Sequence, residues 1–375
     1  MKKLFTLFCA ALLSSSAFAD RFEVNDGNAY LMCTITSTSP AEVMIEYGYP
    51  SVTNLTIPET VTNAGTVYTV TSIGESSFAD AHDLKTLVIS NSVKTIYQGA
   101  FAGLSSLESV TLGDGVEVLE PGAFGECRNL SSINFGSSLK TIGDAAFAEV
   151  AITSLTIPNS VESIGAEAFR KCNNMLSVTI GNSVTSIDPV AFYRNPNLQS
   201  FSGKFASADH KCLIIDGRLV GFAPYGITEY TFPYGMTRIG QWTLYGCSEL
   251  TSITLPSTVN FLENQTFDQC SGITKLQIKA TTPPQLFSTN VFMGFSKSHC
   301  ELIVPEGSEA TYAATPGWDG FAAYTPTGIE TVEADAAGAS VRYYDLHGIE
   351  VDGDALASGL YIRRCGSRAD KVLVK

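Results

Sequence analysis

The sequence predicts a β-rich α/β solenoid, a chain wound into stacked coils whose strands form a parallel sheet, followed by a small all-β unit at the C-terminus. Two observations point to this class. A period of about 23 residues runs from residue 52 to residue 278, and each period contains a short segment of alternating polar and apolar residues. A fixed period of this size is typical of solenoids, because each unit buries its apolar face only against its neighbours.

Six apolar positions define the period, separated by 3, 2, 4, 3 and 5 residues. In one clear copy they are Leu107, Val110, Leu112, Val116, Leu119 and Phe124. The same steps recur from Leu84 to Phe101, Leu130 to Phe147, Ile152 to Phe169, Met175 to Phe192, Ile227 to Leu244 and Leu250 to Phe267. Because 45% of the residues are apolar, single matches arise by chance, but seven linked copies do not.

Each period supplies two extended segments and a turn. Ser109-Val110-Thr111-Leu112 alternates in polarity, as a half-buried strand does, and Pro or Gly follows in the turn. A second extended piece, such as Val184 to Ile187, leads to an expected brief helical turn around the terminal Phe. Asp188-Pro189 has the cap-then-proline order of a helix start. We expect the longer strands of all periods to form one parallel sheet.

Two insertions interrupt the period, and each predicts a β-hairpin. The first period takes nine extra residues that include Asn63-Ala64-Gly65-Thr66. Between Phe192 and Leu244 the spacing is 52 residues instead of 46. Here Asp216-Gly217 separates two apolar runs, which predicts a hairpin near residues 202–226.

These features divide the chain into six expected segments. They are a signal peptide at 1–19, an N-terminal β cap at 20–51, the solenoid at 52–284, a C-terminal cap at 285–325, a linker at 326–339 and the small β unit at 340–375.

The N-terminus is typical of an exported protein. Lys2 and Lys3 precede an apolar run from Leu4 to Leu13, and Ala17-Phe18-Ala19 resembles a cleavage site. No stretch reaches the ~20 apolar residues of a membrane-spanning helix. The net charge of −14 disfavours nucleic acid and anionic lipid as partners. We therefore expect a monomer at the cell surface, where it is associated with the outer membrane, or outside the cell.

Four of the nine cysteines keep the period, each three residues after the terminal Phe or Leu: Cys127, Cys172, Cys247 and Cys270. Other periods place Ala, Leu or Val in this column, so we expect buried, free thiols that act as small apolar side chains. The pattern leaves open the pairing of four cysteines outside it: Cys33, Cys212, Cys300 and Cys365.

The sequence contains no motif of a known catalytic site. It has no G-x-S-x-G elbow, Walker loop or complete dinucleotide-binding glycine pattern. The histidines at positions 82, 210, 299 and 347 have no metal-ligand spacing. We therefore expect no catalytic residues, no metal and no cofactor.

Small polar side chains form two columns along the expected strands. The possible binding face consists of Ser109, Thr111, Ser132, Asn134, Ser154, Thr156, Ser177, Thr179, Ser252 and Thr254. Stacked at one strand spacing, these side chains would cover a flat polar surface of the sheet. One interpretation is a binding platform, and the other is that Thr suits an exposed strand position and Ser is simply small.

The repeat resembles the BspA-type leucine-rich repeat of bacterial surface proteins, as in the segments Asn159 to Phe169 (NSVESIGAEAF) and Asn182 to Phe192 (NSVTSIDPVAF). The likeness covers residues 52–325, including the Asp216-Gly217 hairpin, Ala280 to Pro284 (ATTPP) and the cap from Leu302 to Phe321. It implies leucine-rich repeats in a secreted or surface-exposed protein, which in some members is an adhesin for extracellular proteins or other cells.

The last 35 residues or so resemble the C-terminal sorting domains of the type IX secretion route. The matching segments are Tyr344 to Gly348, Gly359 to Ile362 and Lys371 to Lys375. The likeness implies a sorting role, and the alternative is a small β cap without one.

Three hypotheses for function follow from the sequence. The leading one is a non-enzymatic binding module or adhesin for an extracellular protein or glycan. A second is a structural component of the cell envelope without a specific ligand. A third places an enzyme site in the insertion from Phe201 to Tyr225.

Overall fold

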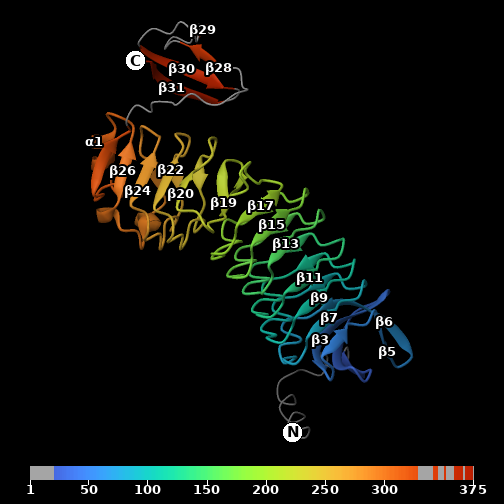
Figure 1. The fold of residues 1–375 in the computed structure, drawn as a ribbon. Helices are drawn as coiled ribbons and strands as arrows, with labels where there is room; N and C mark the ends of the chain where they lie inside the picture. The colour runs from blue at the N-terminus through green and yellow to red at the C-terminus, as the bar shows by residue number, and fades with distance from the viewer. Residues whose placement is uncertain (1–20, 328–340, 345–349, 352–358, 366–367, 375) are drawn as a thin grey trace.

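The computed structural model describes residues 21–327, 341–344, 350–351, 359–365 and 368–374. The expected signal peptide, nearly all of the expected linker and most of the Tyr344 to Gly348 motif lie outside these residues. The chain winds into a stack of coils that runs from the N-terminal strands to helix α1 (Glu309–Ala314) (Figure 1). The solenoid class predicted from the sequence is confirmed.

Each coil carries one longer and one shorter strand, and each strand pairs in parallel with its equivalent in the next coil. The longer strands are β4 (Asn54–Thr56), β7 (Thr86–Val88), β9 (Ser109–Thr111), β11 (Ser132–Asn134), β13 (Ser154–Thr156), β15 (Ser177–Ile180), β17 (Ser200–Gly203), β20 (Glu229–Thr231), β22 (Ser252–Leu255), β24 (Lys275–Ile278), β26 (Glu301–Val304) and β27 (Ala323–Pro326). The shorter strands are β8 (Thr95–Ile96), β10 (Val118–Leu119), β12 (Thr141–Ile142), β14 (Ser163–Ile164), β16 (Ser186–Ile187), β21 (Arg238–Ile239), β23 (Phe261–Leu262) and β25 (Gln285–Leu286).

The expectation of one continuous sheet of longer strands is wrong, because these strands form three sheets. The sheets have the orders β11-β9-β7-β4, β13-β15-β17 and β20-β22-β24-β26-β27. The first break coincides with a shortened repeat: Leu130 and Ile152 are 22 positions apart instead of 23. The second break coincides with the predicted hairpin insertion, which separates β17 from β20.

The N-terminal strands extend the sheet of shorter strands. β1 (Arg21–Asn25), β2 (Ala29–Thr38) and β3 (Ala41–Pro50) form an antiparallel meander, and β3 then pairs in parallel with β6 (Thr66–Ile73). The predicted hairpin at residues 63–66 is confirmed, since β5 (Thr60–Asn63) pairs with β6. Its turn residues Ala64 and Gly65 have positive φ angles of 48° and 83°, as a tight hairpin turn requires.

A corner follows each shorter strand; we use this word for the turn segment that carries the terminal Phe or Leu of the repeat. The expected brief helix at this place is wrong, because the corners are turns. A residue in left-handed backbone conformation stands two positions after the Phe or Leu, which prevents a right-handed helix from continuing. These residues are Gly103, Glu126, Glu149, Lys171, Arg194, Gly246 and Gln269, with φ between 55° and 74°.

The corner phenylalanines form a ladder through the core. Phe78, Phe101, Phe124, Phe147, Phe169 and Phe192 stack ring on ring. Neighbouring ring centroids lie 4.9 to 5.7 Å apart and the rings are within 19° of parallel. The buried apolar residues fall into two clusters, one largely before the hairpin insertion and one from the insertion to the C-terminal cap. The solenoid therefore has two packed cores that meet at the insertion.

A large aromatic pair anchors the C-terminal end of the solenoid. Tyr312 and Trp318 are fully buried, and their polar atoms donate hydrogen bonds to the carbonyl oxygens of Ala280 and Pro284 at 2.8 and 2.9 Å. The two 3-10 helices of this region are η2 (Thr289–Phe292) and η3 (Lys297–His299). After it, β28 (Val341–Tyr344), β29 (Glu350–Val351), β30 (Gly359–Cys365) and β31 (Arg368–Val374) form an antiparallel sheet in the order β29-β28-β30-β31. Within the described residues, no helix is long and apolar enough to cross a membrane.

We expect Phe147→Asp to destabilise the coils on both sides of the substitution. The truncation of a buried Phe costs about 3–5 kcal/mol, and an unpaired buried carboxylate adds to this cost. Hydrogen exchange should then accelerate around Phe124 and Phe169 as well. Phe147→Leu is the matched control, because Leu244 occupies the same column, and it should change the melting temperature little. Faster exchange confined to the substituted corner would contradict a shared core.

Candidate functional site

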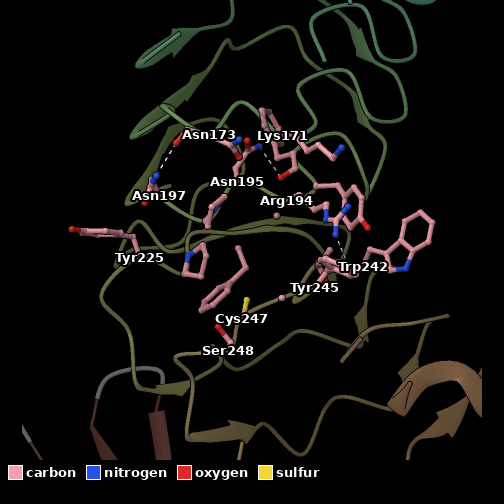
Figure 2. Close-up of a pocket in the computed structure, with 18 of the residues that line it drawn as sticks. Lys171, Asn173, Arg194, Asn195, Asn197, Tyr225, Trp242, Tyr245, Cys247 and Ser248 are labelled. Carbon is pink, nitrogen blue, oxygen red and sulfur yellow. Dashed lines mark hydrogen bonds between the residues drawn. The ribbon is translucent and has the colours of Figure 1, made fainter. Parts of the chain in front are cut away.

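A cleft with a volume of about 840 Å³ opens where the hairpin insertion interrupts the solenoid (Figure 2). We call it the junction cleft. One wall is the corner at residues 193–197, the opposite wall is the corner at residues 242–250, and the floor is formed by residues 220–227. Both walls are successive corners of the stack, so the cleft lies at a place that a further corner would fill.

The junction cleft exists because the coil between its walls has a short corner. Ile187 to Leu198 and Ile239 to Leu250 each span 11 positions, whereas Leu219 to Ile227 spans 8. In this coil β19 (Arg218–Phe222) takes the place of the shorter strand and pairs with β21. Its partner in the hairpin is β18 (Cys212–Ile215), which confirms the predicted hairpin with Asp216 and Gly217 in the turn.

The short corner interrupts a column of main-chain hydrogen bonds. In successive corners, the N–H two residues after the Phe donates to the C=O one residue after the next Phe, as from Gly103 to Gly125 at 2.8 Å and from Lys171 to Tyr193 at 3.0 Å. Beyond the cleft the column resumes, from Gly246 to Asp268. At the cleft itself, neither the Arg194 N–H nor the Tyr245 C=O has a hydrogen-bond partner among the described residues.

Aromatic side chains and one arginine bridge the outer end of the cleft. The Tyr193 ring stacks on Trp242 at 4.9 Å and meets Tyr245 edge-on at 4.8 Å. The guanidinium of Arg194 lies 4.6 Å above the Tyr245 ring and donates a hydrogen bond to the Tyr245 hydroxyl at 2.7 Å. No carboxylate of the described residues pairs with Arg194. Tyr225, which is 51% exposed, lies far from Trp242 along the cleft (Figure 2).

Asn195 contributes a buried polar atom to the wall. Its side chain is 94% buried, since 6% is exposed, and its Nδ2 donates to the carbonyl oxygens of Phe169 and Phe192, both at 2.9 Å. Its Oδ1 is buried without a partner, and so is Nε1 of Trp242. Buried polar atoms without partners are uncommon in folded proteins, so both atoms distinguish this wall from the other corners.

Asn195 occupies the column in which the sequence predicted buried thiols. That prediction is confirmed for Cys127, Cys172, Cys247 and Cys270, which are all buried and free. The Sγ atoms of Cys127 and Cys270 contact the carbonyl oxygens of Phe101 and Leu244 at 3.1 and 2.9 Å, as the Asn195 amide does with Phe169. The three other cysteines whose side chains are described are also buried and free: Cys33, Cys212 and Cys300. The side chain of Cys365 lies outside the description.

The hairpin insertion holds a cluster of polar groups, which bears on the hypothesis of an enzyme site there. Tyr230 donates to Asp209 at 2.7 Å and lies 3.3 Å from the Cys212 sulfur. Burial raises the pKa of the Cys212 thiol to about 12. Because the thiolate is the nucleophilic form, this cysteine is an inert side chain at neutral pH. No group of three or more metal-ligating residues was found among the described residues.

A charged network borders the cleft. Glu149 accepts from Lys171 at 3.0 Å and pairs with Arg128 and Arg170 at 3.0 and 3.3 Å. The hydrogen bond from Lys171 holds the pKa of Glu149 below its ordinary value, the nearby charges act in the same direction, and partial burial opposes them. These cations are therefore already neutralised, and Arg194 is the cation of the cleft without a carboxylate partner in the described chain.

The structure places the ten predicted binding-face residues on the longer strands, and all of them are exposed or half-buried. Ser109 pairs in register with Ser132, and Ser154 with Ser177. The two columns are divided among the three sheets, and in the third sheet Ser252 lies between Glu229 and Lys275. The face is therefore interrupted twice, and hydroxyl groups give way to charges toward the C-terminal end.

Comparison with known proteins identifies the family. The model of the BspA type leucine rich repeat region matches the chain in six copies, over residues 47–154, 140–207 and 221–308. The matched residues make up more than half of the chain, so the chain belongs to this family. No curated protein sequence matches it significantly.

Several solved structures are similar in fold. A leucine rich cell surface protein of Faecalibacterium prausnitzii is 16% identical and aligns over 82% of this chain and 95% of its own, with a TM-score of 0.47. A leucine-rich repeat protein of Eubacterium ventriosum is 15% identical over 81% and 84%, with a TM-score of 0.49. The pneumococcal vaccine antigen PcpA is 14% identical over 82% and 99%, with a TM-score of 0.45.

We expect Glu149→Gln to lower stability by about 1 kcal/mol at neutral pH, because it removes the charge that three cations share. The folded-state pKa of Glu149 lies below its ordinary value of 4.5, so the stabilisation is complete above that pH and disappears as the pH falls through the folded pKa. Thermal melting of both chains between pH 7 and pH 3 should therefore show a difference that shrinks in acid.

Glu126→Gln is the matched control for this measurement. Glu126 occupies the same column one coil earlier, its side chain is 58% exposed and it pairs with Arg128 alone. Its substitution should change melting less than Glu149→Gln at every pH. Equal effects of the two substitutions would show that the network does not act as described.

Proposed function

We propose that this protein is a non-enzymatic binding module, exposed at the cell surface or released from the cell, and that its ligand is an extracellular protein or glycan. The observation that carries the proposal is the junction cleft, a concave site whose walls hold polar groups without partners in a fold of stacked repeats. Concave sites with a few convergent polar groups are the usual form of ligand sites. Membership of the repeat family and the signal-like N-terminus support the surface or extracellular location.

The ten-residue hydroxyl face is the second candidate site of the same function. Its support is the in-register stacking of small polar side chains on β9, β11, β13 and β15. The cleft is the better candidate, because it is concave and contains buried atoms that a ligand can satisfy.

Capture experiments with matched variants test this proposal. We expect the mature chain, residues 20–375, to retain partners from extracellular-matrix preparations or from intact cells of neighbouring bacteria. Ser248→Trp places a bulky ring at the exposed rim of the cleft and should reduce capture at least tenfold. Ser271→Trp changes the equivalent exposed residue one coil later, outside the cleft, and should capture as the parent does.

Two outcomes would contradict the cleft as the site. If Ser248→Trp captures normally while Thr156→Lys abolishes capture, the hydroxyl face is the site. If no variant reduces capture, neither site carries the binding. Added protease separates this function from a structural role in the envelope, because a surface-exposed adhesin on intact cells must be cleaved and a buried structural component is protected.

We further propose that the chain is organised in the six segments expected from the sequence, with residues 340–375 acting as an export address. This unit has its own antiparallel sheet and follows residues of linker composition. Deletion of residues 340–375 should leave the melting temperature of the solenoid unchanged within about 1 °C, while the protein accumulates in the periplasm. Melting curves and cell fractionation check the two halves of the prediction. Lower solenoid stability would make the tail a cap, and unchanged surface display would exclude a sorting role.

A further inference from the structure

The two walls of the junction cleft present opposite halves of a missing main-chain hydrogen bond. In the regular stack, each corner donates to the C=O of the next corner. At the cleft the Arg194 N–H ends one wall and the Tyr245 C=O begins the other, and both lack partners among the described residues. A peptide group needs both an acceptor for its N–H and a donor for its C=O. The walls supply one of each.

We propose that the junction cleft binds a short extended peptide of a partner protein, which takes the place of the missing corner. This inference rests on the proposed binding function and specifies its ligand. The peptide accepts a hydrogen bond from the Arg194 N–H with one carbonyl and donates to the Tyr245 C=O with one N–H. The mode of recognition is strand addition, in which main-chain hydrogen bonds give affinity and pockets give specificity.

The side chains around the cleft define the residues that the peptide carries. Phe192, Val220 and Phe222 line it and are each less than 9% exposed, so they form an apolar floor for one large apolar side chain. Arg194 lacks a carboxylate partner and lies at the exposed rim, which favours an acidic residue nearby in the peptide. The buried Oδ1 of Asn195 accepts a further N–H.

A peptide fits these observations better than a glycan. Sugar rings bind on open aromatic faces, but Tyr193 is already packed against Trp242 and Tyr245, and Arg194 covers the ring of Tyr245. Tyr225 is the cleft aromatic that is exposed by more than half within the described residues. The free main-chain donor and acceptor, in contrast, continue a ladder that the chain itself makes from corner to corner.

The first experiment selects ligands from a library of random linear peptides displayed on phage. The mature chain is the target, and the Ser248→Trp variant removes peptides that bind elsewhere. Melting curves of both proteins establish that they are folded. We expect enriched sequences with a large apolar residue close to an acidic one, which also bind the Ser271→Trp control. Absence of enrichment over the Ser248→Trp variant would overturn the proposal.

The second experiment measures binding of the enriched peptides by fluorescence. The chain has two tryptophans, and Trp318 is fully buried in the C-terminal cap. In a Trp318→Phe background, Trp242 in the cleft is the sole reporter, and a saturable change in its emission is expected. Arg194→Asn, which keeps a residue that tolerates the left-handed conformation, should weaken binding roughly tenfold. N-methylation of one peptide nitrogen should weaken binding by a similar factor, because it removes the N–H donor to Tyr245.

The outcomes separate this inference from the broader function. If N-methylation at every position leaves affinity unchanged, main-chain recognition is wrong. If a glycan array gives signals that Ser248→Trp abolishes while no peptide binds, the ligand is a glycan, and the binding function stands without the peptide. If partner capture itself is insensitive to Ser248→Trp, the proposed site falls together with this inference.

Discussion

Every coil of this solenoid depends on the next for its main-chain hydrogen bonds. The strands pair with strands one coil away, and even the corners donate N–H groups across to the neighbouring corner. A buried peptide group without a partner is costly, so the corners must keep a constant length for the stack to continue. The Phe ladder follows from this pairing, because it fixes the rings about one coil spacing apart. The junction cleft is the result of breaking that constancy at one coil.

The repeated part of the structure could be predicted from the sequence because each coil uses the same apolar positions. The six-position pattern located the strands, the two hairpins followed from Asn63 to Thr66 and from Asp216-Gly217, and the thiol column followed from its offset to the Phe. The corner conformation was missed, because residues such as Glu126 and Lys171 are not usual in the left-handed region and give no signal of it.

The cleft was missed for a different reason. Its cause was visible as the spacing of 52 residues between Phe192 and Leu244, but a longer spacing suggests added structure and not a vacancy. The spacing hides two opposite changes, a hairpin that adds residues and a corner that loses three, from 11 positions to 8. Only the pairing of β19 with β21 shows where the shorter strand of that coil lies, and hence which corner is short. The break in the sheet between β11 and β13 was hidden similarly, in a single missing residue.

The parallel pairing of strands in adjacent coils also determines how the chain reaches its fold. Most strand partners in the solenoid are about 23 positions apart, as Thr86 is from Ser109, so few contacts join distant parts of the sequence. Chains with such local contacts close small loops as they fold, and they fold quickly for their size. Each completed coil is a template for the one that follows, so order can spread along the chain in the direction in which it emerges. The interruption at residues 202–226 divides this process into two blocks, each with its own core.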